Sequence, residues 1–164
     1  MAIDLYRSLE GPEFKRIYRQ LTAPLLSPTK LLLAMWDEHR NAGGLVIGQD
    51  VPSRTAAPLL RHLIVYEPVG DFADFHVRLA GSGYLSQYGR DVTGMAMSEL
   101  FDSETFLHNL RFGRQVVETQ TPLLFLATLT EFEIARWSYE LALLPVLAPD
   151  RATKWLLVSA FPCP

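Results

Sequence analysis

Residues 122–161 read PLLFLATLTEFEIARWSYELALLPVLAPDRATKWLLVSAF. This stretch predicts three strands, over 122–132, 136–146 and 154–161, because long apolar runs are separated by short polar breaks. The breaks are too short for crossover connections, which favours an antiparallel meander. These strands are the centre of the predicted fold.

Both faces of these strands carry apolar side chains. Trp137, Tyr139 and Leu141 share one face of the second strand, whereas Leu144 lies on the opposite face. A sheet that is apolar on both sides must be covered on both sides. One face can take the domain's own helices, and the other needs the N-terminal helices or a partner chain.

The residues upstream of this stretch predict helices and one hairpin. Residues 12–21 predict a short amphipathic helix, with apolar residues at positions 14, 17, 18 and 21. The patterns further along predict a helix over 27–41, strands over 63–67 and 75–82, short helices over 83–89 and 94–101, and a long helix over 103–120. We therefore expect an α+β fold with one five-stranded antiparallel sheet, helices on one face and an N-terminal helical extension.

Length and composition limit the organisation and the partners. The chain has 164 residues, 49% of them hydrophobic and 20% charged, which indicates one folded domain. We expect a leader with the short helix over 1–29 and the domain over 30–164. The net charge of -3 is unlike that of a general nucleic-acid binder. No apolar run is long enough to cross a membrane, and the first residues do not have the pattern of a signal peptide. We therefore expect a cytoplasmic location.

The sequence assigns no catalytic residue, no metal ligand and no cofactor. Cys163 is the only cysteine, which excludes an intrachain disulfide and a multi-cysteine zinc site. No two of the histidines have metal-ligand spacing within a helix; they are His39, His62, His76 and His108. His108 flanks the apolar stripe of the long helix, where it is either a satisfied ring or a haem ligand.

Two carboxylates are the candidates for a small enzyme with a buried acid, and both are poor ones. Such a site needs Asp or Glu in an apolar pocket with a raised pKa. Asp102 precedes the long helix, and Glu140 lies in an apolar strand, where we expect it to face solvent or to pair with Arg136 or Lys154.

Several short motifs occur in the order and spacing of a known family. They are Trp36 with Arg40, Pro-x-Arg ending at Arg54, Arg-Leu-x-Gly starting at Arg78, the G-x-D-x-T-G turn built by Gly89, Asp91, Thr93 and Gly94, and a late Leu-Pro. From about residue 30 to the end, the chain resembles a stand-alone bacterial PAS family long catalogued as a domain of unknown function. The turn residues also have a plain structural interpretation, since Gly, Asp and Thr shape sharp bends.

The resemblance implies a sensory or regulatory module in signalling. PAS domains hold a small ligand between the sheet and the long helix, or transmit a signal through dimer contacts. Strand alternation and helix spacing place the wall of such a pocket at Phe75, Val77, Leu79, Leu85, Phe106, Leu110, Phe125, Trp137 and Tyr139. A flavin photoreceptor needs a cysteine beside the cofactor, and Cys163 is at the wrong end of the chain.

Three hypotheses remain open from the sequence. The first is a PAS-like module that binds a small molecule or a signalling protein and forms a homodimer through the N-terminal helices and the apolar outer sheet face. The second is a protein–protein interaction module without a ligand, whose pocket is filled by its own side chains. The third is the small enzyme described above.

Overall fold

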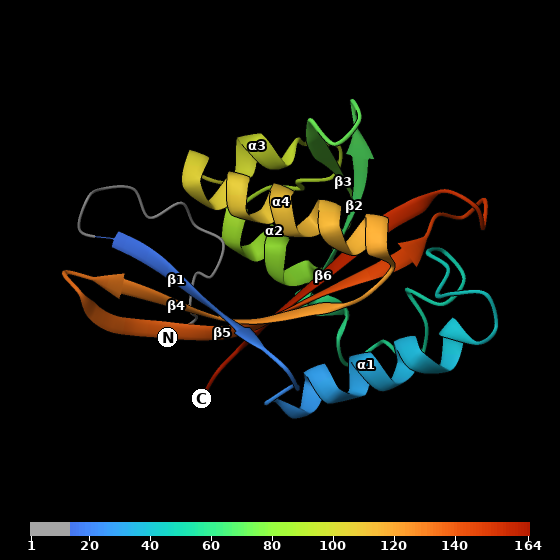
Figure 1. Ribbon diagram of the computed structural model, residues 1–164, viewed down its shortest axis with the longest axis horizontal. Helices are drawn as coiled ribbons and strands as arrows, with labels where there is room; N and C mark the ends of the chain where they lie inside the picture. The colour runs from blue at the N-terminus through green and yellow to red at the C-terminus, as the bar shows by residue number, and fades with distance from the viewer. Residues whose placement is uncertain (1–13) are drawn as a thin grey trace.

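The computed structural model describes residues 14–164, which build one antiparallel sheet with helices above and below it (Figure 1). The strands lie in the spatial order β1-β4-β5-β6-β2-β3. In chain order the elements are β1 (Phe14–Leu21), α1 (Ser27–Arg40), a 3-10 turn (Leu60–His62), β2 (Leu63–Val69), β3 (Asp74–Ala80), α2 (Ser82–Tyr88), α3 (Met97–Leu100), α4 (Ser103–Thr119), β4 (Leu123–Glu131), β5 (Ile134–Leu147) and β6 (Lys154–Pro162).

The α+β class and the antiparallel sheet are confirmed, and so is the meander of β4, β5 and β6. The strand number differs from the expectation, because β1 adds a sixth strand at one edge. The helices also differ in placement. Figure 1 shows α2, α3 and α4 on one side of the sheet and α1 on the other.

The helix predicted over 12–21 is wrong for the residues that the structure describes. Residues 14–21 form β1, which pairs antiparallel with β4 from Phe14 opposite Glu131 to Leu21 opposite Leu124. Phe14 and Tyr18 share a face at helical spacing and also at strand spacing, so the sequence pattern fits both structures. A helix this short is marginal alone, whereas pairing with β4 satisfies the backbone along its whole length. Residues 1–13 of the predicted leader lie outside the described residues.

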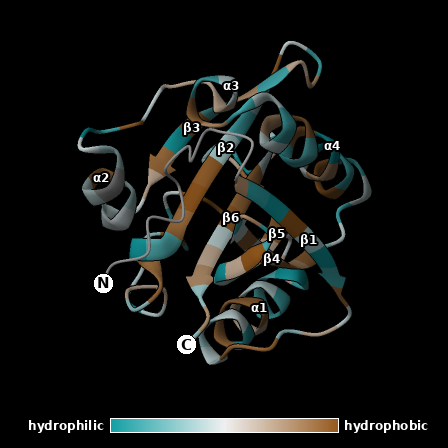
Figure 2. Cartoon of the chain, turned by 90° about the vertical axis from the view of Figure 1, so that its left-hand side faces the viewer, coloured by the Kyte–Doolittle hydropathy of each residue, from teal (hydrophilic) through white to brown (hydrophobic). Residues whose placement is uncertain are grey.

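The two faces of the sheet bury separate apolar clusters. The inner face, under α4, includes Phe75, Val77, Phe125 and Leu156 in one cluster with Val116 of α4. Figure 2 shows the strands running between α1 on one side and α3 and α4 on the other. The expected division into two covered faces therefore holds for most of the sheet.

The outer face is covered by α1 and by the loop that follows it. Leu32, Met35 and Trp36 of α1 are buried against the outer-face residues Leu144 and Leu157. The Trp36 indole Nε1 donates a hydrogen bond of 2.8 Å to the backbone oxygen of Pro145. Since α1 uses its apolar stripe on its own sheet, this stripe is not available to a second chain. The homodimer itself stays a prediction.

A buried carboxylate fixes the entry into α1. Glu140 of β5 is fully buried on the outer face. Its Oε2 accepts a hydrogen bond of 2.5 Å from the backbone N of Leu25, and its Oε1 accepts one of 3.1 Å from the backbone N of Leu26. The expectation that Glu140 faces solvent or pairs with Arg136 or Lys154 is therefore wrong. The carboxylate satisfies the backbone N–H groups of the two residues that immediately precede α1.

Gly81 is required by a close backbone approach where β3 leads into α2. It is the last residue of the Arg-Leu-x-Gly motif, and its backbone N donates a hydrogen bond of 2.8 Å to the oxygen of Leu63. A Cβ atom at this position would lie 1.9 Å from the backbone oxygen of Leu60. The backbone on both sides is held in place, so no side chain can be accommodated.

This contact predicts that Gly81 tolerates alanine less well than Gly89 does. The backbone dihedral angles alone would predict the opposite order. Gly81 has an ordinary negative φ, whereas Gly89 has a φ of 66° with nothing near its missing Cβ. Gly89→Ala should cost about 1–2 kcal/mol through its left-handed conformation. Gly81→Ala should cost about 3 kcal/mol or more through the clash. Urea denaturation of both variants checks the order, and an equal or smaller loss for Gly81→Ala would contradict the steric argument.

Candidate functional site

A small cavity lies between the inner face of the sheet and the helices α3 and α4. Its walls come from β1, β2, β5, β6, α2, α3 and α4; the lining residues are Tyr18, Ile64, Tyr66, Tyr84, Met97, Phe101, Thr105, Asn109, Tyr139, Leu141, Leu143, Leu156 and Val158. About 40 Å³ is open to the centres of water-sized molecules. One water needs about 10–15 Å³ on this measure, so the cavity has room for a few heavy atoms and not for a haem or a flavin.

The sheet register gives the cavity a polar end and an apolar end. At the polar end, Tyr18 of β1 and Tyr139 of β5 lie on either side of Ala127 in one row across the sheet. The small Ala127 side chain leaves space between the two phenol rings. At the more apolar end, Leu143, Val158 and Ile64 form another row across β5, β6 and β2. The phenols of Tyr66 and Tyr84 also line the cavity on the β2 side.

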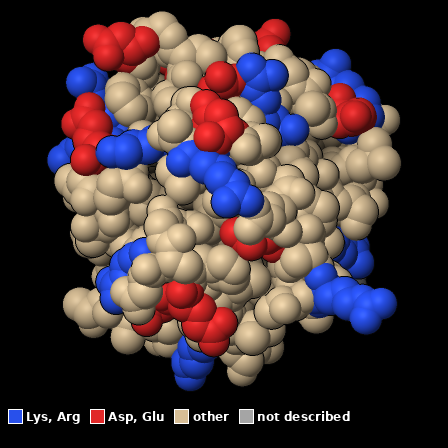
Figure 3. All heavy atoms as spheres, turned by 90° about the vertical axis from the view of Figure 1, so that its right-hand side faces the viewer, with Lys and Arg blue, Asp and Glu red and all other residues tan. Residues whose placement is uncertain are grey.

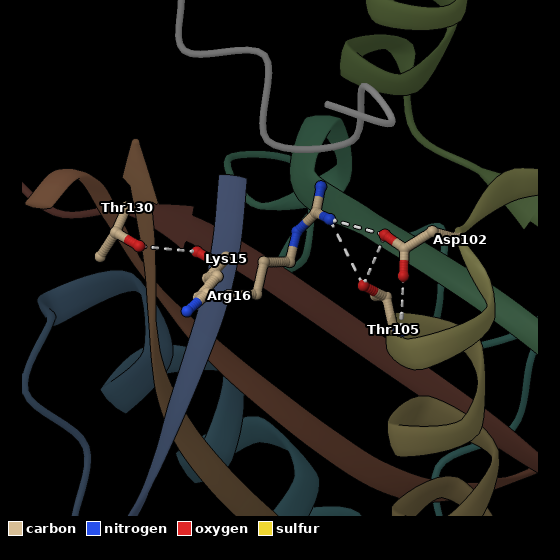
Figure 4. A network of polar contacts seen from close by, with 5 residues as sticks. All are labelled: Lys15, Arg16, Asp102, Thr105 and Thr130. Carbon is tan, nitrogen blue, oxygen red and sulfur yellow. Dashed lines mark hydrogen bonds and ion pairs between the residues drawn. The ribbon is translucent and has the colours of Figure 1, made fainter. Parts of the chain in front are cut away.

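Arg16 and the start of α4 border the polar end (Figure 4). The Arg16 Nη1 lies 3.1 Å from Oδ2 of Asp102 and 3.3 Å from Oγ1 of Thr105. Thr105 in turn donates its hydroxyl to Asp102 Oδ2 at 3.0 Å and its backbone N–H to Oδ1 at 2.9 Å. Asp102 is therefore the N-cap of α4, and the adjacent Ser103 is the first residue of the helix.

Burial raises the pKa of both phenols of the polar end, which as tyrosines are already protonated at neutral pH. The pKa of Tyr139 is raised by its burial, which outweighs the opposing charge and hydrogen bond of Arg16 and the hydrogen bond of Tyr18. The pKa of Tyr18 is raised above its ordinary value by its own burial and by the nearby Tyr139. Both hydroxyls therefore remain hydrogen-bond donors at neutral pH.

The carboxyl of Asp102 remains ionised in the same place. Burial alone would raise the pKa of Asp102, but hydrogen bonds from Thr105 and the charge of Arg16 lower it below the ordinary value. The side chain of Arg16 is 8% exposed and that of Asp102 is 34% exposed. The ion pair therefore joins a nearly buried cation to a partly hydrated anion at the border of the cavity.

His108 belongs to an aromatic cluster beside this polar end. Its ring stacks on Tyr18 with 3.6 Å between the centroids and an interplanar angle of 15°. Phe112 and Phe125 contact the same ring, at centroid distances of 4.7 and 5.3 Å. Burial lowers the pKa of His108, and the nearby Arg111 adds to this effect, while a hydrogen bond with Asn109 opposes it. The geometry gives this ring a packing role and adds nothing to the haem-ligand interpretation.

The structure brings together only part of the pocket predicted from the sequence. Tyr139 lines the cavity. Five other predicted wall residues belong to the inner-face cluster or pack against it, and they do not line the cavity; they are Phe75, Val77, Phe106, Leu110 and Phe125. Leu79, Leu85 and Trp137 lie elsewhere.

Each of these three has a local reason for its position. Between β2 and β3 the register shifts at Val65 and Tyr66, so that Arg78 is an extra residue and Leu79 turns to the outer face. The expected alternation that placed Leu79 inward is therefore wrong. Leu85 is 53% exposed on α2, and Trp137 lines an open groove with Cys163 near the tip of the β4–β5 hairpin.

Sequence reasoning missed Arg16, Tyr18, Thr105 and Asn109. Arg16 and Tyr18 lie in the segment that was predicted to be a helix. The pocket wall predicted from the sequence consisted of apolar and aromatic side chains. In β1 the half-buried Phe14, Arg16 and Tyr18 alternate with the exposed Lys15, Ile17 and Arg19. The sequence does not show this alternation, because the charged Arg16 is on the inner face and the apolar Ile17 is on the outer face. The pairing of β1 with β4 determines which side chains of β1 face the cavity side of the sheet.

The family-motif residues stabilise local structure, and none of them lines the cavity. The Arg40 guanidinium carbon lies 5.6 Å from the Trp36 ring centroid, and its Nη2 lies 2.8 Å from Asp37. Arg78 pairs with Glu67, and Arg54 is exposed.

The G-x-D-x-T-G motif is a turn held by its own side chains. Asp91 Oδ1 accepts hydrogen bonds from the backbone N of Thr93 at 2.9 Å and from its hydroxyl at 2.7 Å. Gly89 and Gly94 have φ values of 66° and 88°, which glycine adopts most readily. The motif therefore shapes the segment between α2 and α3.

Charged and ligating groups show no further site in the described part of the chain. Over residues 14–164, no group of three or more His, Cys, Asp and Glu side chains is arranged to hold a metal ion. Within the same residues, no helix is both long and apolar enough to span a bilayer. The face shown in Figure 3 carries acidic and basic atoms interspersed, without a continuous basic area.

The fold is an antiparallel sheet that packs a long helix over a small internal cavity. The family model described as PAS domain matches residues 26–158. The chain therefore belongs to the PAS domain family, whose members are sensory and signalling modules. The match begins after β1, so the strand that supplies Arg16 and Tyr18 lies outside the matched region. No curated protein matches the chain.

Packing around His108 predicts a stability that falls on acidification. Because its pKa in the folded protein is below the ordinary value of 6.5, the unfolded chain binds the proton more readily. Stability is then complete above about pH 6.5 and decreases as the pH falls below that value. Denaturation at about pH 7.5 and about pH 5.5 should show a smaller decrease for His108→Gln than for the unchanged protein.

His62, whose pKa is also lowered by burial, is present in both proteins and cancels in this comparison. His76→Gln, a substitution on the other sheet edge, controls for the loss of one histidine. An identical pH dependence with and without His108 would contradict the assignment.

Proposed function

We propose that this chain is a sensory module that holds a small molecule between its sheet and α4 and passes the signal to a protein partner. The observation that carries the proposal is the cavity whose walls combine tyrosine and threonine hydroxyls with apolar side chains. Membership of the PAS domain family supports a sensory role in general. The cavity indicates the chemistry of the molecule.

The cavity walls favour a small molecule with a polar head and an apolar body. Tyr18, Thr105 and Tyr139 can donate hydrogen bonds at the polar end, while Leu143 and Val158 offer only apolar contact. The limited volume favours a ligand of a few heavy atoms, or a larger one that moves α4 away from the sheet.

A second candidate is a protein–protein interaction module that binds no ligand. The small volume of the cavity favours it, because a nearly filled core needs no occupant. The part of the outer face beside α1 supports a protein contact, and we propose it as the surface of a homodimer. Ile17 of β1 is 57% exposed there, and Leu25 and Leu31 at the start of α1 are 52% and 46% exposed.

Native mass spectrometry of the protein purified from its own host, with an absorption spectrum, separates the two candidates. The sensor proposal expects an additional bound mass. Val158→Phe places a larger side chain in the cavity and should lose that mass, whereas Leu107→Phe, at a residue 62% exposed on α4, should keep it. A dimer mass without any adduct would instead support the interaction module.

A further inference from the structure

We propose that the polar end of the cavity binds the carboxylate of a small organic acid, with Arg16 as its charged anchor. This inference rests on the proposed sensor function and specifies its ligand class. The carboxylate of the acid takes the place of Asp102 at the Arg16 guanidinium, and its short apolar tail lies against Leu143 and Val158 on the inner face of the sheet.

The groups at this end favour an anionic acceptor over any other head group. The Tyr18 and Tyr139 hydroxyls stay protonated and can donate. The guanidinium of Arg16 has donors only, and it lies within 3.3 Å of Thr105, which lines the cavity. Hydrogen bonds from charged or buried donors to a carboxylate are the strong ones. An ammonium head group would meet the Arg16 charge and is disfavoured.

The unequal exposure of the ion pair makes the exchange possible. Arg16 is nearly buried at 8% exposure, so its charge needs an anion at this point at all times. Asp102 is 34% exposed and keeps other partners if it leaves Arg16. The Thr105 backbone N–H bonds to its Oδ1 at 2.9 Å, and the N-terminus of α4 favours its negative charge. An acid can therefore replace Asp102 without leaving either charge isolated.

The exchange also gives the ligand a route to the rest of the molecule. Asp102 caps α4, and Arg16 belongs to the edge strand β1, which pairs only with β4 among the described strands. When the acid replaces Asp102, the ion pair between β1 and the N-cap of α4 is broken, while the hydrogen bond of Arg16 to Thr105 still joins the two elements. The position of β1 against α4 then depends on whether the cavity is occupied.

The size of the cavity determines which acid is a suitable probe. A volume of about 40 Å³ corresponds to a few water-sized positions, which suits an acid with a tail of two or three carbons. Butyrate is the probe, butyramide is its uncharged counterpart with the same tail, and butylamine carries the opposite charge.

Titration calorimetry of the full chain with these three compounds tests the proposal. A charge-assisted hydrogen bond is worth about 1.5–3 kcal/mol, so butyrate should bind about 10- to 100-fold more tightly than butyramide. Butylamine should not bind. Arg16→Gln should remove the preference for butyrate over butyramide, whereas Arg111→Gln, an exposed arginine on the same helix as Thr105, should retain it.

Asp102→Asn gives the sharper outcome, since it removes the competing charge and keeps an N-cap side chain. This variant should strengthen butyrate binding several-fold, because butyrate no longer has to displace a partly exposed ion pair. Butyramide binding should stay unchanged. A purely structural ion pair predicts the opposite, because its loss would loosen the cavity. This variant also keeps the proposal testable if Arg16→Gln does not fold.

The outcomes separate this inference from the sensor function. Equal binding of butyrate and butyramide would overturn the charged anchor and retain a ligand cavity. An adduct from the host that is not an acid, with no butyrate binding, would overturn the ligand class and retain the sensor. If no compound binds and no adduct is found, both proposals fail.

Discussion

The whole fold depends on a sheet whose central strands are apolar on both faces. Leu143 and Val158 face α4, and the neighbouring Leu144 and Leu157 face α1, so neither face is open to water where these residues of β5 and β6 lie. The chain must therefore place helices on both sides of one sheet, and it does so with α1 near the start of the sequence and with α2, α3 and α4 from its middle part. The buried Glu140, bonded to the backbone before α1, fixes the return of the chain across the outer face.

The cavity follows from this arrangement at the point where packing is least complete. Small Ala127 separates two tyrosines on the inner face, and the start of α4 approaches them with Thr105. The edge strand β1 closes this end and adds Arg16, which the first turn of α4 neutralises through Asp102. We propose that this cation beside the cavity determines which ligands are preferred, and the strand β1 that supplies it lies outside the region that the family model matches.

Much of the fold was predictable, and the failures have distinct causes. The helices α1 and α4 and the strands β4 to β6 were found because their apolar periods are long and unambiguous. β1 was missed because Phe14 and Tyr18 satisfy both periods and only a partner strand distinguishes them. Leu79 was placed on the wrong face because one extra residue in β3 reverses the alternation, and no local signal marks such a bulge.

The sequence by itself determined the class of fold and the family, because periodicity and turn motifs are local properties of the chain. It also supplied Tyr139 as a wall of the pocket. Only the tertiary structure decided that β1 joins the sheet and that Arg16, Asp102 and Thr105 meet at one end of the cavity. These contacts join residues more than eighty positions apart, and their geometry depends on strand register and helix placement, which no short stretch of sequence contains.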